Sequence, residues 1–477
     1  MEERKRSLEH SLDLDADTMR RLGYSVVDRI VDRITNLRQD AAWRGALRAQ
    51  LEPPLLEPAP EDGNPEFDQL LDRLYARVLP FAARVDHPRF LAFVPGCPTW
   101  PSILGDWIAT GHNIFQGTWL GSSGPSALEL VVLEWFRQWL GLPETAGGLL
   151  MSGGSAANLT ALVCARSARS ADEQSRAVIY LGSESHSSVA KAARILGFPT
   201  DRVRILPVDA DFRIPIPDLE RAIARDRADG NAPLLIVANA GATSTGAIDP
   251  LPELAALAKR ESMWLHVDGA YGGFAVLTDR GKRWLTGIEQ ADSVTLDPHK
   301  WLYQPFETGC LLVRDSANLV QAFHMMPDYL QDTAVAGQEV NFGDRGIQLT
   351  RSARAIKVWL SLQYFGLSRI RAAIDQTLDL TLDAEAMLRA AGCFEILTGA
   401  QLGVVCFRRT WPGASETVLE QRNLRLTRDL AQSGLALISS TRVQGRYALR
   451  FCIMNHRTTS VDIEQVVDWL ATADVGD

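Results

Sequence analysis

The chain has 477 residues, of which 46% are hydrophobic and 22% are charged, the composition of an ordinary globular protein. A chain of this length is expected to divide into more than one domain, because a single hydrophobic core stops growing at smaller sizes. The formal net charge of -9 argues against nucleic acid and anionic membranes as partners, since both attract basic surfaces.

The cysteines and the N-terminus predict the compartment. None of the six cysteines forms a CxxC pair or stands at zinc-finger spacing, and several lie within apolar runs. We therefore expect buried free thiols in a reducing compartment, and no metal site. The opening stretch MEERKRSLEH has no apolar segment behind it, and no apolar run is long enough to span a bilayer. A soluble cytoplasmic protein is expected.

The first ninety residues predict helices joined by an extended connector. Apolar side chains recur at helical spacing between Asp15 and Leu37, and a second helical pattern covers residues 66–80. The Pro-rich stretch LEPPLLEPAPEDGNP, residues 51–65, separates them. This segment is too thin to bury a core alone, so we expect residues 1–90 to form an arm that clasps a second copy of the chain.

The middle of the chain alternates between short β-branched runs and helical patterns. The runs are AVIYLG, VRILPVD, PLLIVANAG, MWLHVDGAY, DSVTLD and GCLLVRD. Such alternation predicts an α/β domain over residues 91–365, with a mainly parallel sheet covered on both faces. Ligands of such sheets bind at the carboxyl ends of the strands.

The pattern changes near Thr350. A long amphipathic helix is expected over residues 351–366, followed by strands at 394–399, 402–410 and 447–455. Residues 366–477 are therefore predicted to form a small C-terminal α+β domain.

Polar and small residues stand at the predicted strand ends. The turn MSGGSAANLTAL opens a helix at Met151, and its Gly153, Gly154, Ser155 and Ala156 would offer backbone N–H groups to a phosphate. An ordinary helix start would read the same way, and the spacing matches neither a Walker A loop nor a dinucleotide fingerprint.

Three further strand-end residues have two interpretations each. His186 could cap a helix or lie over a flat ring. Asp268, at the end of WLHVD, could form a turn or pair with a cationic ring nitrogen. Thr243 could make a local turn bond or lie beside a ligand.

The segment TLDPHKW places Lys300 between His299 and Trp301. A surface lysine with a packed stem is one interpretation. The other is a desolvated amine that attacks an aldehyde to form a Schiff base. A phosphate turn, a ring-stacking imidazole, a carboxylate for a pyridinium nitrogen and such a lysine together suit pyridoxal phosphate.

The chain resembles the group II pyridoxal-phosphate decarboxylases, which include aromatic-L-amino-acid, glutamate and histidine decarboxylases. DSVTLDPHKW is similar to the family's cofactor-lysine segment, and HVDGAYGG, SESHSSVAKAA and NAGATSTGAIDP are similar to its companion segments. HPRFLAFVPG resembles the substrate-entry segment. The likeness runs from the N-terminal helices to LRFCIMNHRTT, so it covers nearly the whole chain.

The resemblance implies fold type I, aspartate aminotransferase-like, in a homodimer with its site at the interface. It implies that Lys300 binds the cofactor aldehyde, that Asp268 keeps the ring nitrogen protonated and that His186 stacks on the ring. It implies that Tyr329, on a mobile loop, returns a proton after carbon dioxide leaves. The other residues implied to touch the cofactor, several through its phosphate, are Ser155, Ala156, Thr243, Ala270, Ser293 and His299.

Several departures from the family pattern concern the substrate. They are Pro95–Gly96, Gly117, Thr350 and Asp297. The two small residues, Gly96 and Gly117, could enlarge the pocket for an indole, with Phe93, Pro95, Trp100 and Trp119 lining it, although such aromatic residues are usually core.

These departures favour an aromatic amino acid as substrate, with tryptophan ahead of tyrosine or phenylalanine. A decarboxylase of acidic or diamino acids and an aromatic aldehyde synthase are the alternatives, and an aminotransferase or desulfurase is a more distant one.

Overall fold

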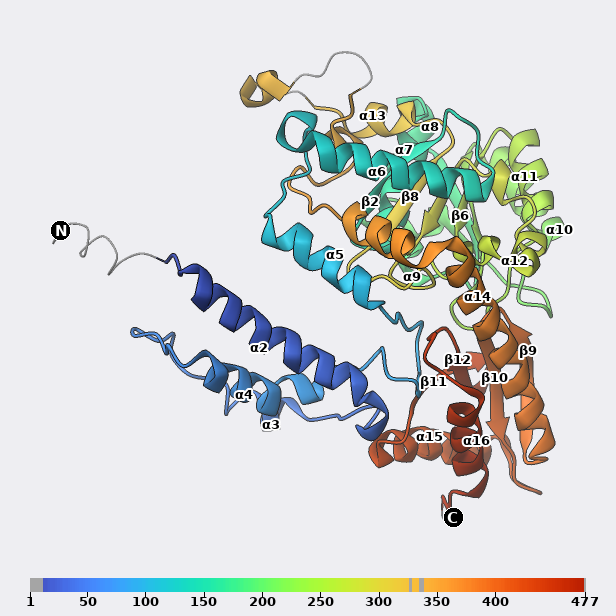
Figure 1. Cartoon of the computed structure of the whole chain (residues 1–477). Helices are drawn as coiled ribbons and strands as arrows, with labels where there is room; N and C mark the ends of the chain where they lie inside the picture. Colours follow the sequence, from blue (N-terminus) through green and yellow to red (C-terminus); the bar gives the residue numbers. More distant parts are fainter. Residues whose placement is uncertain (1–11, 326–327, 334–338, 476–477) are drawn as a thin grey trace.

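The computed structural model describes residues 12–325, 328–333 and 339–475, and Figure 1 shows them as an N-terminal pair of helices beside a body built on two sheets. The larger sheet has seven strands in the order β2-β8-β7-β6-β5-β3-β4, and the smaller has five in the order β1-β11-β12-β10-β9. The α/β class and the mainly parallel large sheet predicted from the sequence are confirmed.

Six of the seven strands of the large sheet form from the predicted apolar runs, and β2 was not predicted. Four of its neighbouring pairs are parallel, and the pairs of β8 with β2 and with β7 are antiparallel. Strands β3, β6, β7 and β8 are buried along their whole length, as expected for a sheet covered by helices. The strands are β2 (Gly147–Met151), β3 (Ala177–Gly182), β4 (Val203–Leu206), β5 (Ala232–Asn239), β6 (Trp264–Asp268), β7 (Ser293–Leu296) and β8 (Gly309–Val313).

Helices pack against this sheet with their apolar sides. Helix α7 contacts the four strands from β5 to β8, α10 contacts β5, and α11 contacts β5 and β6. The helices of this part are α5 (Trp100–Gly111), α6 (Trp119–Leu140), α7 (Gly154–Ser167), α8 (Ala171–Ser175), α9 (Ser187–Ile195), α10 (Ile216–Ala228), α11 (Leu251–Arg260), α12 (Asp279–Trp284) and α13 (Ala317–Phe323).

Helix α14 (Ala355–Ala390) links the two sheets. Gly366 interrupts it with a φ of 72°, at the boundary proposed from the sequence between the large and small domains. The limits 1–90, 91–365 and 366–477 stay a prediction.

The smaller sheet takes one strand from far away in the sequence. β1 (Phe90–Leu91) pairs in parallel with β11 (Leu437–Val443). The other strands are β9 (Phe394–Gln401), β10 (Val404–Arg409) and β12 (Arg446–Cys452), and helices α15 (Glu416–Ser433) and α16 (Ser460–Thr472) accompany them. β11 was not predicted, because its sequence LISSTRV lacks a β-branched apolar run.

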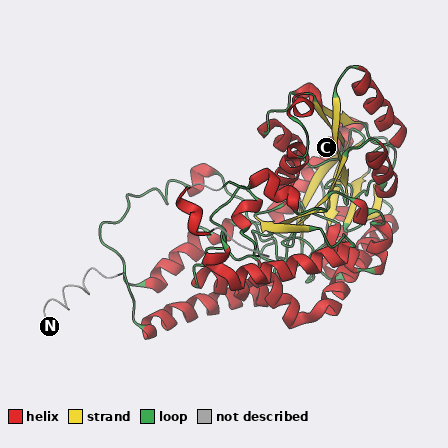
Figure 2. Cartoon of the chain, turned by 90° about the horizontal axis from the view of Figure 1, so that it is seen from above, coloured by secondary structure: helices red, strands yellow, loops and turns green. Residues whose placement is uncertain are grey.

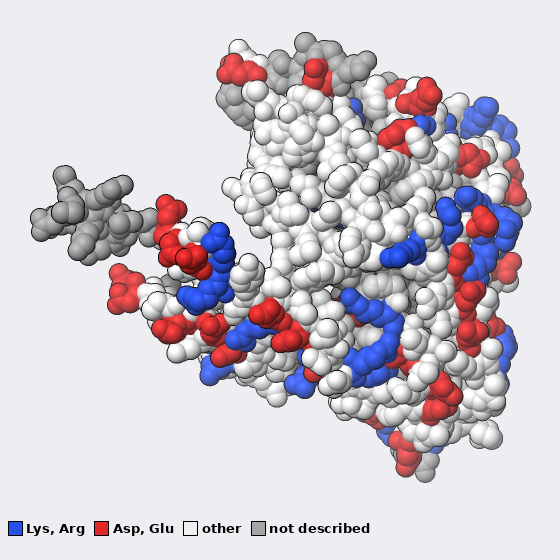
Figure 3. All heavy atoms as spheres, viewed as in Figure 1, with Lys and Arg blue, Asp and Glu red and all other residues white. Residues whose placement is uncertain are grey.

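The described N-terminal segment contains the predicted helices, and its role as an arm that clasps a second copy of the chain stays a prediction. Helix α2 (Ala16–Thr35) begins at Asp15, whose carboxylate accepts hydrogen bonds from the backbone N–H groups of Asp17 and Thr18 at 3.0 and 2.9 Å. It runs beside α4 (Phe67–Arg77), α3 (Arg48–Leu51) lies near them, and Figures 1 and 2 show the arm extending away from the body. No described residue of α2 is buried. Figure 3 shows the arm rich in charge, whereas the body beside it is largely uncharged.

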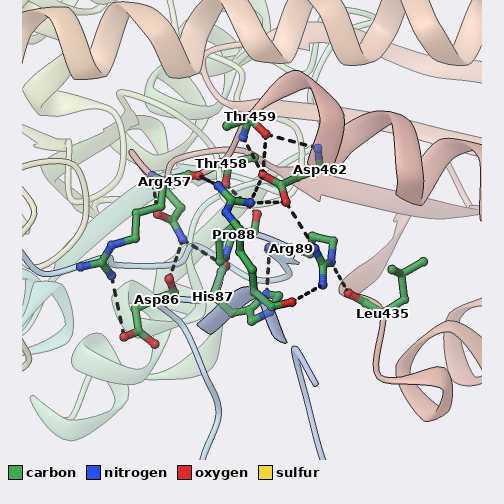
Figure 4. Close-up of polar contacts among 11 residues, drawn as sticks. Asp86, His87, Pro88, Arg89, Leu435, Arg457, Thr458, Thr459 and Asp462 are labelled. Atoms are coloured by element: carbon green, nitrogen blue, oxygen red, sulfur yellow. Dashed lines mark hydrogen bonds and ion pairs between the residues drawn. The ribbon is translucent and has the colours of Figure 1, made fainter. Parts of the chain in front are cut away.

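A cluster of polar contacts joins the arm to the small domain (Figure 4). Asp462 is 3% exposed and accepts hydrogen bonds from Arg38 at 2.5 and 2.6 Å, while Arg89 lies 3.4 Å away. Asn455 donates to the carbonyl oxygens of Asp86 and His87, both at 3.0 Å. The segment leading into β1 is thereby held to the turn before α16.

Five of the six cysteines are buried, Cys393 is half-buried, and all six are free thiols. Burial raises the pKa of Cys97 and of Cys164 to about 12, so both thiols stay protonated and inert. Among the helices of the described part, none combines the length and the apolar composition needed to cross a membrane.

Replacing Asp462 tests the polar cluster. Burial would raise the pKa of Asp462, but hydrogen bonds from Arg38 and Thr459 outweigh it and hold the pKa below its ordinary value. The carboxylate therefore stabilises the fold at neutral pH, and this contribution is lost as the pH falls through the folded-state pKa. Asp462→Asn should lower the free energy of unfolding by about 2 kcal/mol at neutral pH, measured by urea denaturation.

Asp468→Asn, an exposed change on the same helix, should alter the free energy by less than about 0.5 kcal/mol. The difference between Asp462→Asn and the natural protein should shrink in acid. An equal difference at about pH 3 and pH 7 would contradict the role of the charge.

Candidate active site

A cavity of about 340 Å³ opens at the carboxyl ends of the parallel strands. It collects residues from α7, from the starts of α9 and of the loop after β5, and from the ends of β6 and β7. Ten of the residues predicted from the sequence line it: Gly153, Gly154, Ser155, Ala156, His186, Thr243, Asp268, Ala270, His299 and Lys300.

The N-terminus of α7 forms one wall. Gly153 is its N-cap in an extended conformation, and the helix begins at Gly154. The first N–H groups of a helix have no partner within it, so this end attracts an anion. A Cβ at Gly154 would lie 3.0 Å from both the Ala270 Cβ and an Asp297 carboxylate oxygen, so a larger residue would require these neighbours to move away from the helix end.

Asp268 is the last residue of β6 and is 8% exposed. One carboxylate oxygen accepts a hydrogen bond from the Ala270 N–H at 3.2 Å, and the other accepts one from the Asn158 amide at 2.8 Å. The local turn and the site therefore use the same side chain. A buried acceptor at a strand end suits a protonated ring nitrogen.

His186 is the N-cap of α9 and also lines the cavity. Its Nδ1 accepts a hydrogen bond from the Ser188 N–H at 3.2 Å. The two interpretations left open by the sequence are compatible, because capping uses one ring nitrogen and leaves the ring face available.

Lys300 lies directly after β7 with its Nζ 2.9 Å from an Asp297 carboxylate oxygen. Its side chain is 21% exposed and lines the cavity, so it is not a surface lysine. Trp301 is fully buried and stacks on Tyr271, with ring centroids 5.3 Å apart. This packing fixes the backbone that carries the amine.

His299 faces the start of α7. A Cβ at Gly153 would lie 3.2 Å from the His299 Cε1, and the His299 Nδ1 accepts a hydrogen bond from the Thr308 N–H at 3.2 Å. Burial lowers the pKa of His299, which outweighs the opposite effect of Asp297, so the ring is neutral at pH 7.

Ser293 does not reach the described cavity. It begins β7, three positions before the strand end, and its hydroxyl binds the Trp264 indole and the His266 ring, both at 2.8 Å. A side chain at the start of a parallel strand lies beneath the site rather than in it.

The four residues proposed for the substrate pocket lie outside the described cavity lining. Phe93 is 66% exposed, Pro95 is buried, Trp100 packs edge-on against Trp107 at 5.6 Å, and Trp119 begins α6. Phe93 and Pro95 follow β1, and Trp100 is the first residue of α5.

The two small residues of the entry region do not enlarge the pocket. A Cβ at Gly96 would lie 2.0 Å from the His299 carbonyl oxygen, and one at Gly117 would lie 2.1 Å from the Leu349 carbonyl oxygen. Both positions are glycine because two backbone segments touch there. Thr350 is exposed.

Tyr329 belongs to a short 3₁₀ helix, Asp328–Thr333, and its side chain lies outside the described residues. Its predicted role stays a prediction.

Sequence reasoning missed several residues of the cavity. Asn158 lies one helical turn after Ser155 in MSGGSAANLTAL, so helical spacing alone could have placed it on the same face. Asp297 was noted only as a departure, although it stands three residues before Lys300. The others are Ser188, Asn239, Tyr271 and Glu307, which carried no signal beyond their position near strand ends or loops.

These residues fit pyridoxal phosphate. The helix end suits its phosphate, the buried Asp268 carboxylate suits its ring nitrogen, and the Lys300 amine suits its aldehyde. They face one cavity, and the packing at Gly154 and Trp301 holds them in place.

Comparison with known proteins agrees with this chemistry. The family model described as "Pyridoxal-dependent decarboxylase conserved domain" matches residues 50–410. An aromatic-L-amino-acid decarboxylase of Bacillus atrophaeus is 40% identical over 96% of each chain. Human histidine decarboxylase is 32% identical over 96% of this chain and 70% of its own length.

A crystal structure of Oryza sativa TDC with PLP and tryptamine superposes with a TM-score of 0.92 at 28% identity, over 97% of this chain and 99% of the rice chain. The likeness agrees with fold type I, which the sequence predicted, and thus with the expected cofactor. The chain belongs to the pyridoxal-dependent decarboxylase family.

Proposed function

We propose that the chain removes carbon dioxide from an aromatic L-amino acid and releases the amine, with tryptophan ahead of tyrosine and phenylalanine. The observation that carries the proposal is the convergence of the Lys300 amine, the Asp268 carboxylate and the start of α7 on one cavity. When bound, the cofactor supplies an electron sink for the electrons of the broken carbon–carbon bond.

Each residue of the cavity has a separate task in this proposal. Lys300 would hold the cofactor by its aldehyde and would serve again in the release of the product. Asp268 keeps a proton on the ring nitrogen, because a buried carboxylate stabilises a cation beside it. His186 covers the ring and limits its movement.

The phosphate would be held at the start of α7. The N–H groups of the first turn and Ser155 would donate to it, with the neutral His299 beside them. Ala156, Thr243 and Ala270 would line the remaining wall. Ser293 would act from beneath, through its hydrogen bonds to Trp264 and His266, rather than on the phosphate.

The aromatic substrate rests on the relatives and on the entry segment. The Bacillus relative is named for aromatic amino acids, and the rice structure contains tryptamine. Phe93, Pro95, Trp100 and Trp119 would form the pocket with a second copy of the chain, which fits the high exposure of Phe93 in one copy. The human relative makes histidine the second candidate. Acidic or diamino acids and the oxidative aldehyde reaction remain alternatives.

A homodimer is part of this proposal, and so is a cytoplasmic location, in keeping with the free thiols. Helix α2 exposes Met19 and Tyr24, and Leu120 at the start of α6 is 70% exposed. The largely uncharged face in Figure 3 lies beside the arm. A second copy would cover these apolar side chains.

The substrate is tested by incubating the cofactor-loaded protein with amino acids and measuring carbon dioxide and amine. We expect amine from tryptophan at the highest kcat/KM, and none from glutamate. Lys300→Ala should abolish multiple turnover, because the aldehyde loses its covalent anchor. Lys191→Ala, an exposed lysine on α9, should keep the natural rate. Amine from acidic substrates only would refute the aromatic assignment.

Tyr329→Phe tests the proton donor. Without the hydroxyl, the α-carbon should be reprotonated slowly, and the product should shift from amine towards aldehyde in the presence of oxygen. The ratio of amine to aldehyde, measured by chromatography, reports this shift. Tyr364→Phe, an exposed tyrosine on α14, is the matched control. An unchanged ratio would remove Tyr329 from the mechanism.

The dimer is tested by sedimentation. The natural protein should sediment as two chains of 52.5 kDa each. Met19→Glu combined with Tyr24→Glu should shift the mass towards one chain, because charge would replace apolar contacts on α2. Leu424→Glu, an exposed apolar residue on α15, should leave the mass unchanged. A single-chain mass for the natural protein would refute the dimer.

A further inference from the structure

Asn158 stands at the centre of a buried hydrogen-bond network beneath the cavity. It is 1% exposed, and its carboxamide contacts four side chains. The amide nitrogen donates to Asp268 at 2.8 Å and to Ser188 at 2.9 Å. The amide oxygen accepts from Thr295 at 2.8 Å and lies 3.0 Å from the His266 Nε2.

The direction of every bond in this network follows from its far end. The indole N–H of Trp264 can only donate, and it lies 2.8 Å from the Ser293 hydroxyl. Ser293 can therefore donate its own hydrogen bond to the His266 Nδ1, also at 2.8 Å, and this direction agrees with the other end of the network, where the Asp268 carboxylate can only accept from Asn158. Burial lowers the pKa of His266 to about 4, so the ring is neutral and carries its proton on Nε2.

That proton fixes the orientation of the amide. The His266 Nε2–H donates to the Asn158 oxygen, which leaves both amide protons for the opposite side. One of them points at Asp268 and the other at Ser188. If the amide were flipped, its N–H would meet the N–H of His266 and its oxygen would face the Asp268 carboxylate.

The second branch reaches His186. Ser188 accepts a hydrogen bond from the Asn158 amide. Its own hydroxyl proton is therefore available for a hydrogen bond to the His186 Nδ1 at 2.8 Å. The His186 Nδ1 is thereby held by the hydroxyl of Ser188 as well as by its backbone N–H at 3.2 Å. One amide therefore contacts, directly or through Ser188, both side chains that would face the cofactor ring.

We propose that Asn158 is a positioning residue: it orients the Asp268 carboxylate towards the ring nitrogen and, through the Ser188 hydroxyl, helps to hold the His186 ring in place. This inference rests on the proposed function, because it assigns a task towards the cofactor of that same site. Ser293 becomes the distant support of the network rather than a phosphate ligand. A merely structural amide would affect folding but not the ring nitrogen.

The test compares two ligands that differ only at that nitrogen. The cofactor-free protein is titrated with pyridoxal phosphate and with its analogue in which C–H replaces the ring nitrogen. Asn158→Leu keeps the side-chain volume but removes the donor to Asp268. It should weaken binding of pyridoxal phosphate by at least about tenfold. Binding of the analogue should change by less than about twofold, since the analogue makes no bond to Asp268.

Two further variants keep the test decisive. Ser293→Ala breaks the network far from the cavity and should cause a smaller loss with the same ligand dependence. If Asn158→Leu does not fold, the binding of the two ligands is compared in Ser293→Ala instead. Thr160→Val, on the same helix but outside the network, should bind both ligands as the natural protein does.

NMR of an isotope-labelled ring nitrogen gives a readout independent of affinity. Its resonance in the natural protein should be that of a protonated nitrogen, and Asn158→Leu should move it towards the unprotonated position. An equal loss for both ligands, or no loss for either, would overturn the role of Asn158. If the natural protein bound neither ligand, the proposed function would fail, and this inference with it.

Discussion

The contact between the Asn158 amide and the Asp268 carboxylate joins the two elements on which the site depends. Asp268 ends a buried parallel strand, and Asn158 lies on the helix whose first turn forms the opposite wall. Neighbouring parallel strands end at the same edge, so the residues that follow β5, β6 and β7 meet there without a dedicated loop. A hydrogen bond to a charged acceptor in a buried place is stronger than one in water and costs more to break. The start of α7, which would bind the phosphate, and the Asp268 carboxylate, which would bind the ring nitrogen, are therefore held at a fixed distance from each other.

A single short segment connects this site with the rest of the molecule. Residues 86–91 are held by the small domain through Asn455 and through the pairing of β1 with β11. A few positions later, Gly96 touches the carbonyl oxygen of His299, next to the site lysine. Arg38 brings the arm to the same small domain through Asp462. The arm, the small sheet and the cofactor lysine thus share one chain of contacts, although they are far apart in sequence.

The sequence predicted the parts of the site that depend on local pattern. Lys300, Asp268 and His186 stand directly after apolar runs, and the end of a buried strand is a place that periodicity can locate. The helices α2, α9, α10 and α11 followed from spacing in the same way.

The position of Ser293 could not be predicted, because its task depends on Trp264 and His266 from another strand. The tight packing at Gly96 and Gly117 could not be predicted either. The sequence shows that a residue is small, but not whether neighbouring backbone fills the space beside it. Strand β11 was not predicted from the sequence, because about half of its residues are polar and its pairing partners, β12 and β1, lie elsewhere in the chain.

The break in α14 shows how stereochemistry alone can set the angle between two parts of a chain. Gly366 has a φ of 72°, yet the space where its side chain would stand is open. A larger residue would fit by volume, but a φ of 72° with a ψ of 157° is a conformation that essentially only glycine adopts, and it would cost another residue about 1–3 kcal/mol. Such a residue would favour one straight helix from Ala355 to Ala390, and the part of α14 after Gly366 would then run in another direction relative to the part before it. The orientation of the small domain is therefore encoded by the absence of a Cβ at a position that contacts nothing.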